Sequence, residues 1–222
     1  MTFILNVLHK DISVLAADQK AFAEWTSISG FPSRSKAVSH DNKKIETNST
    51  GLMAIGVSGY SEHNSYIDEF RRSSEINDGL SIIRRHMEEF LLIDDRPTLI
   101  KSASSFENEC IASFYDSDTQ TFFTNEFSYN EFSNSTRLHR ASDDVKVFCA
   151  GSGRDHFDCI IGAAEVSLLV EGSEYSHIQD ILISWAIEVF KRVSEADEGC
   201  GAEPIFAVAN RMNNDFRIIS IR

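Results

Sequence analysis

The chain has 222 residues, of which 42% are hydrophobic and 25% are charged, and its formal net charge is −13 at pH 7. This composition is typical of a globular protein rather than a disordered one, and the length suits a single domain over residues 1–222. The excess of acidic residues argues against a general nucleic-acid binder, because such a protein needs a basic surface to replace counterions on phosphate.

Signals of membrane insertion, export and metal binding are missing from the sequence. No apolar run approaches the roughly 20 residues that span a bilayer, and the opening MTFILNVLHK has no basic start and no small-residue cleavage site. The cysteines form no CxxC pair and have no zinc-ligand spacing; they are Cys110, Cys149, Cys159 and Cys200. We therefore expect a cytoplasmic protein with reduced cysteines and with no metal or cofactor.

The first part of the chain predicts a β-hairpin that begins almost at the first residue. Two short apolar runs, 3–9 and 12–17, are separated by a Lys-Asp pair. Residues 22–42 are polar and include glycine and proline, which predicts a long loop or excursion. Strands are expected next at 44–47 and 52–57, with a polar turn between them.

The rest of the chain alternates between helices and strands. Apolar residues near the 3.6 period predict a helix pair at 62–76 and 80–92 and a second pair at 157–170 and 175–195. The remaining strands are expected at 109–115, 121–127, 136–141, 145–150, 205–209 and 216–221. Along the chain the elements are ordered as strands, a helix pair, strands, a second helix pair and strands. This order predicts two sheets packed face to face with a helix layer outside each, an α/β/β/α sandwich.

Several polar residues that could take part in chemistry lie at the ends of these elements. In chain order they are Thr2, Asp18, Lys44, Ser152, Asp197 and Cys200. Each alone has an ordinary interpretation, since an aspartate at the end of a strand usually starts a turn. The Gly-Ser-Gly at 151–153 could suggest a phosphate loop, but it lacks the further glycine and the Gly-Lys-Ser/Thr of nucleotide sites.

Taken together, the motifs resemble those of the proteasome β-subunit family and of the two-ring ATP-dependent peptidase of the bacterial heat-shock system. The matching segments are Ala-Ala-Asp at 16–18, Lys-Lys-Ile at 43–45, Gly-Val-Ser-Gly at 56–59, Gly-Ser-Gly at 151–153 and Asp-Glu-Gly-Cys-Gly at 197–201. The resemblance covers most of the chain and lies in the order of the motifs. It implies the four-layer fold of N-terminal nucleophile hydrolases.

The resemblance also implies a threonine peptidase mechanism. After removal of Met1, the Thr2 hydroxyl would attack a peptide carbonyl with its own α-amine as the base. Lys44 would place a positive charge beside that hydroxyl, and Asp18 would hold Lys44 in place. Val57 would lie near the floor of the first specificity pocket.

Further roles carried over from the family concern the amine, the oxyanion and the assembly. Ser152 and Asp197 would form hydrogen bonds around the α-amine, with Cys200 in place of the family's serine, and the Gly59 N–H would stabilise the oxyanion. By resemblance, the substrate would be unfolded polypeptide and the assembly a homo-oligomeric ring served by an ATPase unfoldase.

The sequence departs from the family pattern in Cys200, in a longer segment between Asp18 and Lys44, and in Met1, which would block the amine of Thr2 unless it is removed. These departures leave two alternatives open, a catalytically silent scaffold of the same fold and an amidase acting on a small molecule. Cys200 could instead be a reactive thiol, although no histidine lies near it in the sequence.

Overall fold

The computed structural model describes residues 2–19, 44–58, 65–92, 108–129 and 134–220, and the backbone of four short segments between residues 21 and 39. Two five-stranded antiparallel sheets, two small two-stranded sheets and four α-helices lie in this part of the chain. The strands of the two five-stranded sheets and the helices match the expected elements closely. Their ends differ from the expected ends by a few residues.

The first sheet has the strand order β12-β1-β2-β13-β14. Its strands are β1 (Ile4–His9), β2 (Ile12–Asp18), β12 (Lys146–Ala150), β13 (Pro204–Asn210) and β14 (Asn213–Ser220). The predicted N-terminal hairpin is confirmed, because Ile4 pairs with Ala17 and His9 with Ile12. Every residue of β1 and β2 is buried, which shows that both faces of this part of the sheet are covered.

The second sheet has the strand order β11-β10-β9-β8-β7. Its strands are β7 (Ile45–Thr47), β8 (Met53–Ser58), β9 (Asn108–Asp116), β10 (Thr121–Tyr129) and β11 (Asn134–Arg140). All neighbouring strands run antiparallel.

The segment predicted as a long loop over 22–42 contains short paired strands. β3 (Ala21–Phe22) pairs with β6 (Ala37–Ser39), and inside this pair β4 (Trp25–Thr26) pairs with β5 (Pro32–Ser33). A continuous loop is therefore wrong at these strands, whereas an excursion from the sheet, the other form of the prediction, can contain them. The remaining residues of this segment lie outside the described part of the chain.

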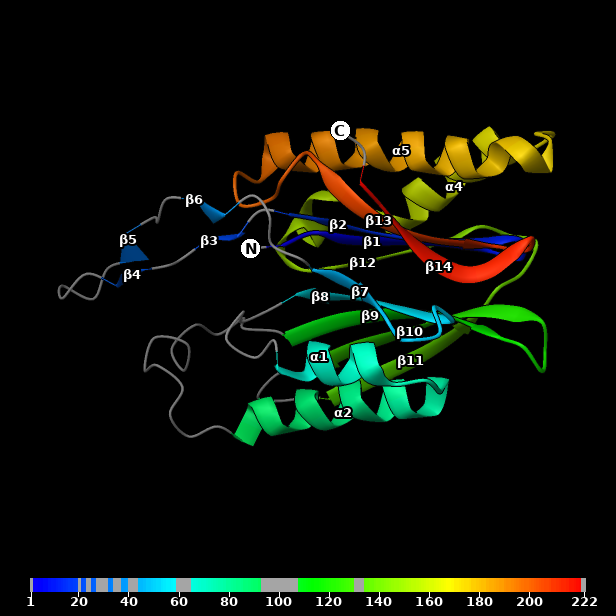
Figure 1. The fold of residues 1–222 in the computed structure, drawn as a ribbon. Helices are drawn as coiled ribbons and strands as arrows, with labels where there is room; N and C mark the ends of the chain where they lie inside the picture. The colour runs from blue at the N-terminus through cyan, green and yellow to red at the C-terminus, as the bar shows by residue number, and fades with distance from the viewer. Residues whose placement is uncertain are drawn as a thin grey trace.

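The helices lie on the outer faces of the two sheets (Figure 1). They are α1 (Ser65–Arg72), α2 (Ile76–Leu92), α4 (Cys159–Val170) and α5 (Tyr175–Ala196), and a 3₁₀ helix, η2 (Ser152–His156), precedes α4. In Figure 1, α4 and α5 run along the first sheet, and α1 and α2 run along the second.

The helix predicted over 62–76 ends earlier, and residues 76–79 belong to the next helix. Residues 62–64 lie outside the described part of the chain. Asn77-Asp78-Gly79 resembles a turn, but a side chain at Gly79 would come within 2.9 Å of the Met53 sulfur. Because a glycine there lets the first turn of α2 approach β8 closely, tertiary packing overrides the local turn signal.

The helix predicted over 157–170 begins two residues later than expected. The Asp158 carboxylate accepts hydrogen bonds from the backbone nitrogens of Ile160 at 2.8 Å and Ile161 at 3.1 Å, and so caps α4. Residues 152–156 before this cap form η2.

Apolar side chains form three separate clusters that follow the alternation of the strands. Phe3 packs with Phe190 against the inner side of α5, whereas Ile4, the next residue, packs with Phe122 in a cluster between the two sheets. A third cluster, which includes Phe70, lies between the second sheet and its helices.

Buried polar side chains cross the space between the two sheets. The Thr124 hydroxyl donates a hydrogen bond to Asn6 Oδ1 at 2.7 Å, and the hydroxyls of Ser13 and Ser113 are 2.6 Å apart. All four side chains are inaccessible to solvent. Such partners fix the register of one sheet on the other, because each buried polar group would otherwise lose its hydrogen bond.

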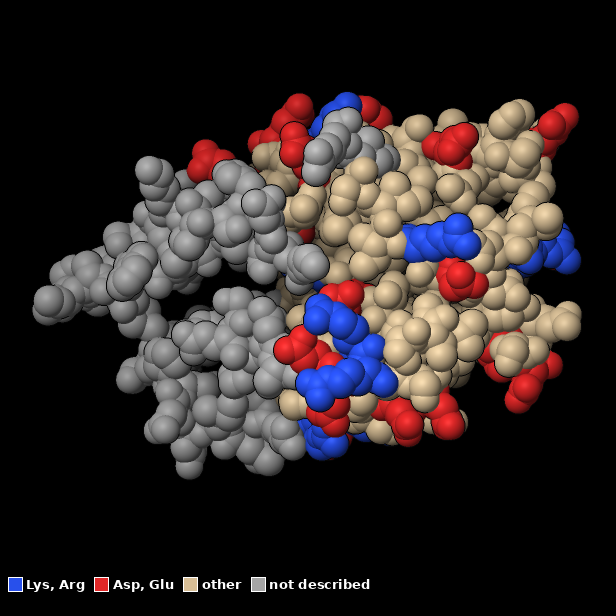
Figure 2. Space-filling model, in the orientation of Figure 1, with Lys and Arg blue, Asp and Glu red and all other residues tan. Residues whose placement is uncertain are grey.

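On the face shown in Figure 2, basic side chains are interspersed with acidic ones, and no continuous basic surface is visible there. Among the described residues, acidic and basic side chains also form ion pairs, such as Arg71 with Glu46 and Arg85 with Glu69. Within the described residues, no helix is both long enough and apolar enough to cross a membrane.

We predict that Thr124→Val lowers the free energy of unfolding by about 1–3 kcal/mol, because Asn6 Oδ1 loses its donor while it remains buried. Thr121→Val is the matched control on the same strand, where the side chain is half-buried, and we expect a change within about 0.5 kcal/mol. Denaturant unfolding measures both values. Equal losses in the two variants would show that the buried contact between the sheets contributes nothing.

Candidate active site

Strand pairing brings the predicted site residues to one edge of the first sheet. Ile4 of β1 pairs with Ala150 of β12 on one side and with Ala17 of β2 on the other, and Pro204 of β13 pairs with Asp18. Because these strands are antiparallel, the start of the chain, the end of β2, the Gly-Ser-Gly motif and the loop before β13 all meet there.

The carboxylate of Asp18 links three of these segments to Lys44, the residue before β7. Its Oδ1 accepts hydrogen bonds from Lys44 Nζ at 2.8 Å and from the Phe3 backbone nitrogen at 2.9 Å, and its Oδ2 accepts one from the Gly201 backbone nitrogen at 3.1 Å. The Asp18 side chain is 0% exposed. One buried anion thus connects the ammonium group of Lys44 to the peptide that joins residues 2 and 3.

Lys44 lies immediately before β7, and its side chain is 5% exposed. Its carbonyl oxygen accepts a hydrogen bond from the Val57 backbone nitrogen at 3.0 Å, which anchors it beside β8. Burial lowers the pKa of Lys44 from its ordinary value, and the charge of Asp18 and its hydrogen bond act in the opposite direction. Asp18 therefore offsets part of the cost of placing a cation in the interior.

Both polar backbone atoms of Thr2 bind to the Gly-Ser-Gly turn. The Thr2 nitrogen donates to Ser152 Oγ at 3.3 Å, and the Gly153 nitrogen donates to the Thr2 carbonyl oxygen at 3.3 Å. Gly151 has a φ of 85°, and a β-carbon there would lie 2.1 Å from the Thr2 carbonyl oxygen. This position therefore requires glycine for its conformation and for the close approach of Thr2.

Asp197 connects Ser152 to Cys200. Its Oδ2 accepts hydrogen bonds from Ser152 Oγ at 3.2 Å and from Cys200 Sγ at 3.3 Å, while its Oδ1 accepts one from the Gly199 nitrogen at 2.8 Å. Burial would raise the pKa of Asp197, but the hydrogen bonds from Gly199, Cys200 and Ser152 together lower it. A chain of hydrogen bonds thus runs from the Thr2 nitrogen through Ser152 to an ionised carboxylate.

Cys200 is buried, with its side chain against Gly153 and Phe3. Burial, followed by the charges of Asp18 and Asp197, raises the pKa of the Cys200 thiol to about 12. The thiol is therefore neutral near pH 7, which argues against its use as a reactive thiolate. In this structure its sulfur is a hydrogen-bond donor to Asp197.

Glu109 and Arg154 belong to this site although the sequence analysis did not select them. Glu109 begins the buried part of β9 in the second sheet, and its Oε2 accepts a hydrogen bond from the Gly151 nitrogen at 2.6 Å. Arg154 in η2 forms an ion pair with Oε1 of the same carboxylate. The sequence offered two signals for these residues. Glu109 is an acidic residue at the start of an apolar strand, and Arg154 directly follows Gly-Ser-Gly.

Two predicted residues cannot be placed in the same way. Gly59 and Met1 lie outside the described residues, so the oxyanion donor and the state of the chain start remain predictions. Ser58, the residue before Gly59, ends β8, and its hydroxyl lies 3.0 Å from the position that a β-carbon of Gly151 would occupy. Val57 lies next to Lys44, and its role in a specificity pocket remains a prediction.

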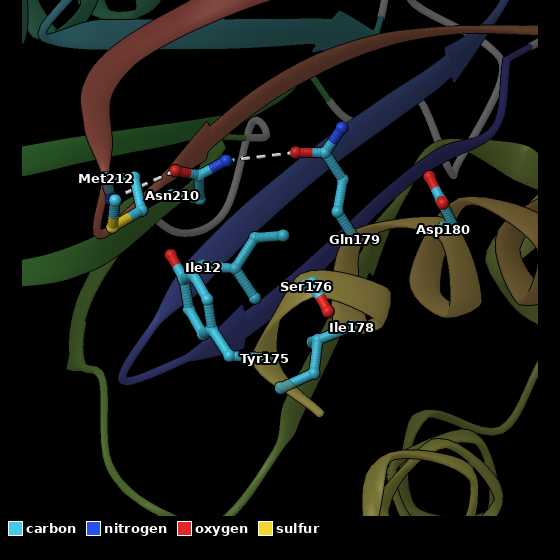
Figure 3. A pocket seen from close by; sticks show the side chains of 8 residues that line it. All are labelled: Ile12, Tyr175, Ser176, Ile178, Gln179, Asp180, Asn210 and Met212. Carbon is cyan, nitrogen blue, oxygen red and sulfur yellow. Dashed lines mark hydrogen bonds between the residues drawn. The ribbon is translucent and has the colours of Figure 1, made fainter. Parts of the chain in front are cut away.

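A shallow pocket lies at the opposite end of the first sheet (Figure 3). It is lined by Ile12 at the start of β2, by Tyr175 at the start of α5 and by Asn210 at the end of β13. Ile12 and Asp18 are the two ends of β2, roughly 20 Å apart at about 3.3 Å per residue. The pocket is therefore remote from Thr2.

We predict that Gly151→Ala destabilises the protein more than Gly172→Ala, although both glycines have positive φ. Gly172 has no atom within 4 Å of the added carbon, so its substitution should cost only the strain of a left-handed residue, about 1–2 kcal/mol. Gly151→Ala should cost about 1–3 kcal/mol more, because it displaces the Thr2 carbonyl. Denaturant unfolding of both variants tests this, and equal costs would contradict the close contact with Thr2.

Comparison with known proteins gives a fold but no family. No protein-family profile and no curated protein matches the chain. Among solved structures, the Anbu (Gly-1) mutant from Hyphomicrobium sp. strain MC1 is similar, with a TM-score of 0.56 and 13% sequence identity, over 100% of this chain and 88% of that one. Anbu has a proteasome-like fold of the N-terminal nucleophile hydrolase type. At this identity the similarity concerns the fold alone, and the two antiparallel sheets and four helices of the described residues fit a proteasome-like fold broadly.

Proposed function

We propose that this protein is a threonine-type N-terminal nucleophile hydrolase, a divergent relative of proteasome β-subunits that cleaves peptide bonds in unfolded polypeptide. The observation that supports this best is the Asp18 carboxylate, which binds both Lys44 and the peptide nitrogen next to Thr2. A buried ion pair is weak evidence for stability, because well-packed apolar side chains of similar volume are often as stable in its place. Its position beside Thr2 therefore supports a chemical role for the pair.

The proposal includes the four-layer α/β/β/α arrangement of that fold. It is supported by three apolar clusters, one between the sheets and one between each sheet and its helices. The similarity to Anbu along the whole chain points in the same direction.

In the proposed reaction, loss of Met1 converts the Thr2 nitrogen from an amide into a primary amine. An α-amine has an ordinary pKa of about 7.7–8.0, so a useful neutral fraction exists near pH 7. This amine takes the proton of the Thr2 hydroxyl as the oxygen attacks the carbonyl carbon, and then gives the proton to the leaving amine. Ser152, hydrogen-bonded to the Thr2 nitrogen and to Asp197, orients the amine.

Lys44 contributes positive charge that favours the ionised form of the hydroxyl. Burial lowers the pKa of Lys44 and so favours its neutral form, whereas the charge of Asp18 and its hydrogen bond favour the charged form. The Gly59 N–H is proposed as the donor to the oxyanion that forms on the attacked carbonyl. Donors of this kind are worth about 10²–10³ in rate in comparable sites.

Assembly into a homo-oligomeric ring, with an ATPase that unfolds substrates, is part of the proposal. Four large apolar side chains on α4 are exposed, which supports a contact between subunits; they are Ile160, Ile161, Leu168 and Leu169.

A catalytically silent scaffold is the second candidate, and Cys200 favours it. Its thiol donates to the same Oδ2 of Asp197 that receives the Ser152 hydroxyl. A thiol is a weak donor and acceptor, so the network around the Thr2 nitrogen is poorer than one built with serine.

We predict that a peptide epoxyketone, a reagent that bridges the hydroxyl and the amine of an N-terminal threonine, forms one adduct on Thr2 of the Met1-free protein. Intact mass and peptide mapping measure it. Thr2→Ser keeps a hydroxyl and an amine and should still react, while Thr2→Ala should give no adduct and lose peptide hydrolysis by about 10³-fold or more.

The same measurement separates the alternatives. A folded, Met1-free protein that forms no adduct would contradict the enzyme and favour the scaffold. Adduct formation with hydrolysis of small amides alone would favour an amidase of the same fold. Full hydrolysis in Thr2→Ala would remove Thr2 from the mechanism.

A further inference from the structure

Two cysteines that the proposed reaction does not use lie in contact where residues 150–158 begin and end. We call these residues the Ser152 loop. Cys149 is in β12 and Cys159 is the first residue of α4, and their sulfur atoms are 3.1 Å apart. A disulfide has a sulfur–sulfur distance of about 2.05 Å, so the two atoms need to approach by only about 1 Å to form the bond. Both cysteines are free thiols in the structure.

The segment between the two cysteines is the part of the chain that holds Thr2. It contains the glycine that approaches the Thr2 carbonyl, the Ser152 hydroxyl that binds the Thr2 nitrogen, and the whole of η2. A bond between Cys149 and Cys159 would join the two ends of this loop. It would restrict the loop without adding any contact to Thr2 itself.

Exposure separates this pair from the other cysteines. Cys149 and Cys159 are half-buried and pack against the cluster of Phe3 and Phe190, whereas Cys110 and Cys200 are 1% and 2% exposed. The pair is therefore less enclosed by the fold than the other two thiols, which favours its reaction with a dissolved oxidant.

The surroundings also distinguish the two members of the pair. Cys159 is at the N-terminus of α4, where the helix dipole favours a thiolate, and its hydrogen bond with Cys149 lowers the pKa of Cys159. The same hydrogen bond, together with burial, raises the pKa of Cys149. Cys159 is therefore the thiol that attacks first.

We propose that Cys149 and Cys159 are a redox pair that forms a reversible intramolecular disulfide with low-molecular-weight disulfides, and that this bond locks the Ser152 loop. The Cys159 thiolate attacks one sulfur of oxidised glutathione, which breaks that disulfide and releases one glutathione thiolate. Cys149 then loses its proton to solvent and attacks the Cys159 sulfur, which releases the second glutathione. Two protein thiols are oxidised, and one glutathione disulfide is reduced to two thiols.

The test uses the full-length protein and oxidised glutathione, and it does not depend on any hydrolytic activity. We expect the intact mass to fall by about 2 Da, with a cross-link between the peptides of Cys149 and Cys159 that dithiothreitol removes. In Cys149→Ser the second step cannot occur, so a stable glutathione adduct of about 305 Da should remain on Cys159. Cys159→Ser should react far more slowly, because Cys149 has the raised pKa.

Hydrogen exchange of backbone amides tests the locking of the loop. Exchange in residues 151–157 should slow by about tenfold in the oxidised wild type and stay unchanged in oxidant-treated Cys159→Ser. Adducts on both cysteines without the 2 Da loss, or a cross-link between two chains, would overturn the redox pair. A disulfide with unchanged exchange would overturn the locking.

Discussion

A carboxylate that is shut away from water must receive hydrogen bonds on its oxygens, and Asp18 receives them from three places that are distant in the sequence. These donors are Lys44, the Phe3 nitrogen and the Gly201 nitrogen. Loss of one partner of such a buried pair costs about 3–5 kcal/mol, because the remaining charge stays in the interior. The position of the first residues therefore depends on Lys44, which is the only lysine paired with Asp18 among the described residues.

The rest of the site extends this arrangement with parts of both sheets. Thr2 is held by the turn after β12, and that turn is held in its place by Glu109, which comes from the opposite sheet. Asp197, at the end of α5, receives the Ser152 hydroxyl. Since each contact joins elements that meet only in the folded state, the Thr2 backbone has a defined place only when the two sheets are assembled.

Much of this arrangement could be predicted from the sequence, and the reasons are local. Short apolar runs predicted β1 and β2, and the order of short motifs identified Asp18, Lys44 and Ser152, which the structure brings to one edge. The contacts that depend on side chains from distant strands could not be predicted. Glu109 was one acidic residue in a strand, and nothing in its neighbours indicates that it binds the Gly151 nitrogen.

Local patterns also failed where packing between elements decides the conformation. Gly79 follows Asn-Asp and signals a turn, yet it lies within α2 because the helix approaches Met53 at that point. Cys149 and Cys159 have no spacing that indicates a pair, and only the return of the chain through η2 brings their sulfurs together. Sequence periodicity describes which face of an element is buried, but not which element covers it.

The central claim is that Asp18 acts on Thr2 through Lys44, and a double-mutant cycle tests it directly. The rate of Thr2 labelling by a peptide epoxyketone would be measured in the Met1-free wild type, Asp18→Asn, Lys44→Met and the double variant, each verified as folded. We expect strong non-additivity, with the double variant labelled no more slowly than the slower single variant. If the rate losses of the two single variants multiply in the double variant, as they do for independent residues, Asp18 does not act on Thr2 through Lys44.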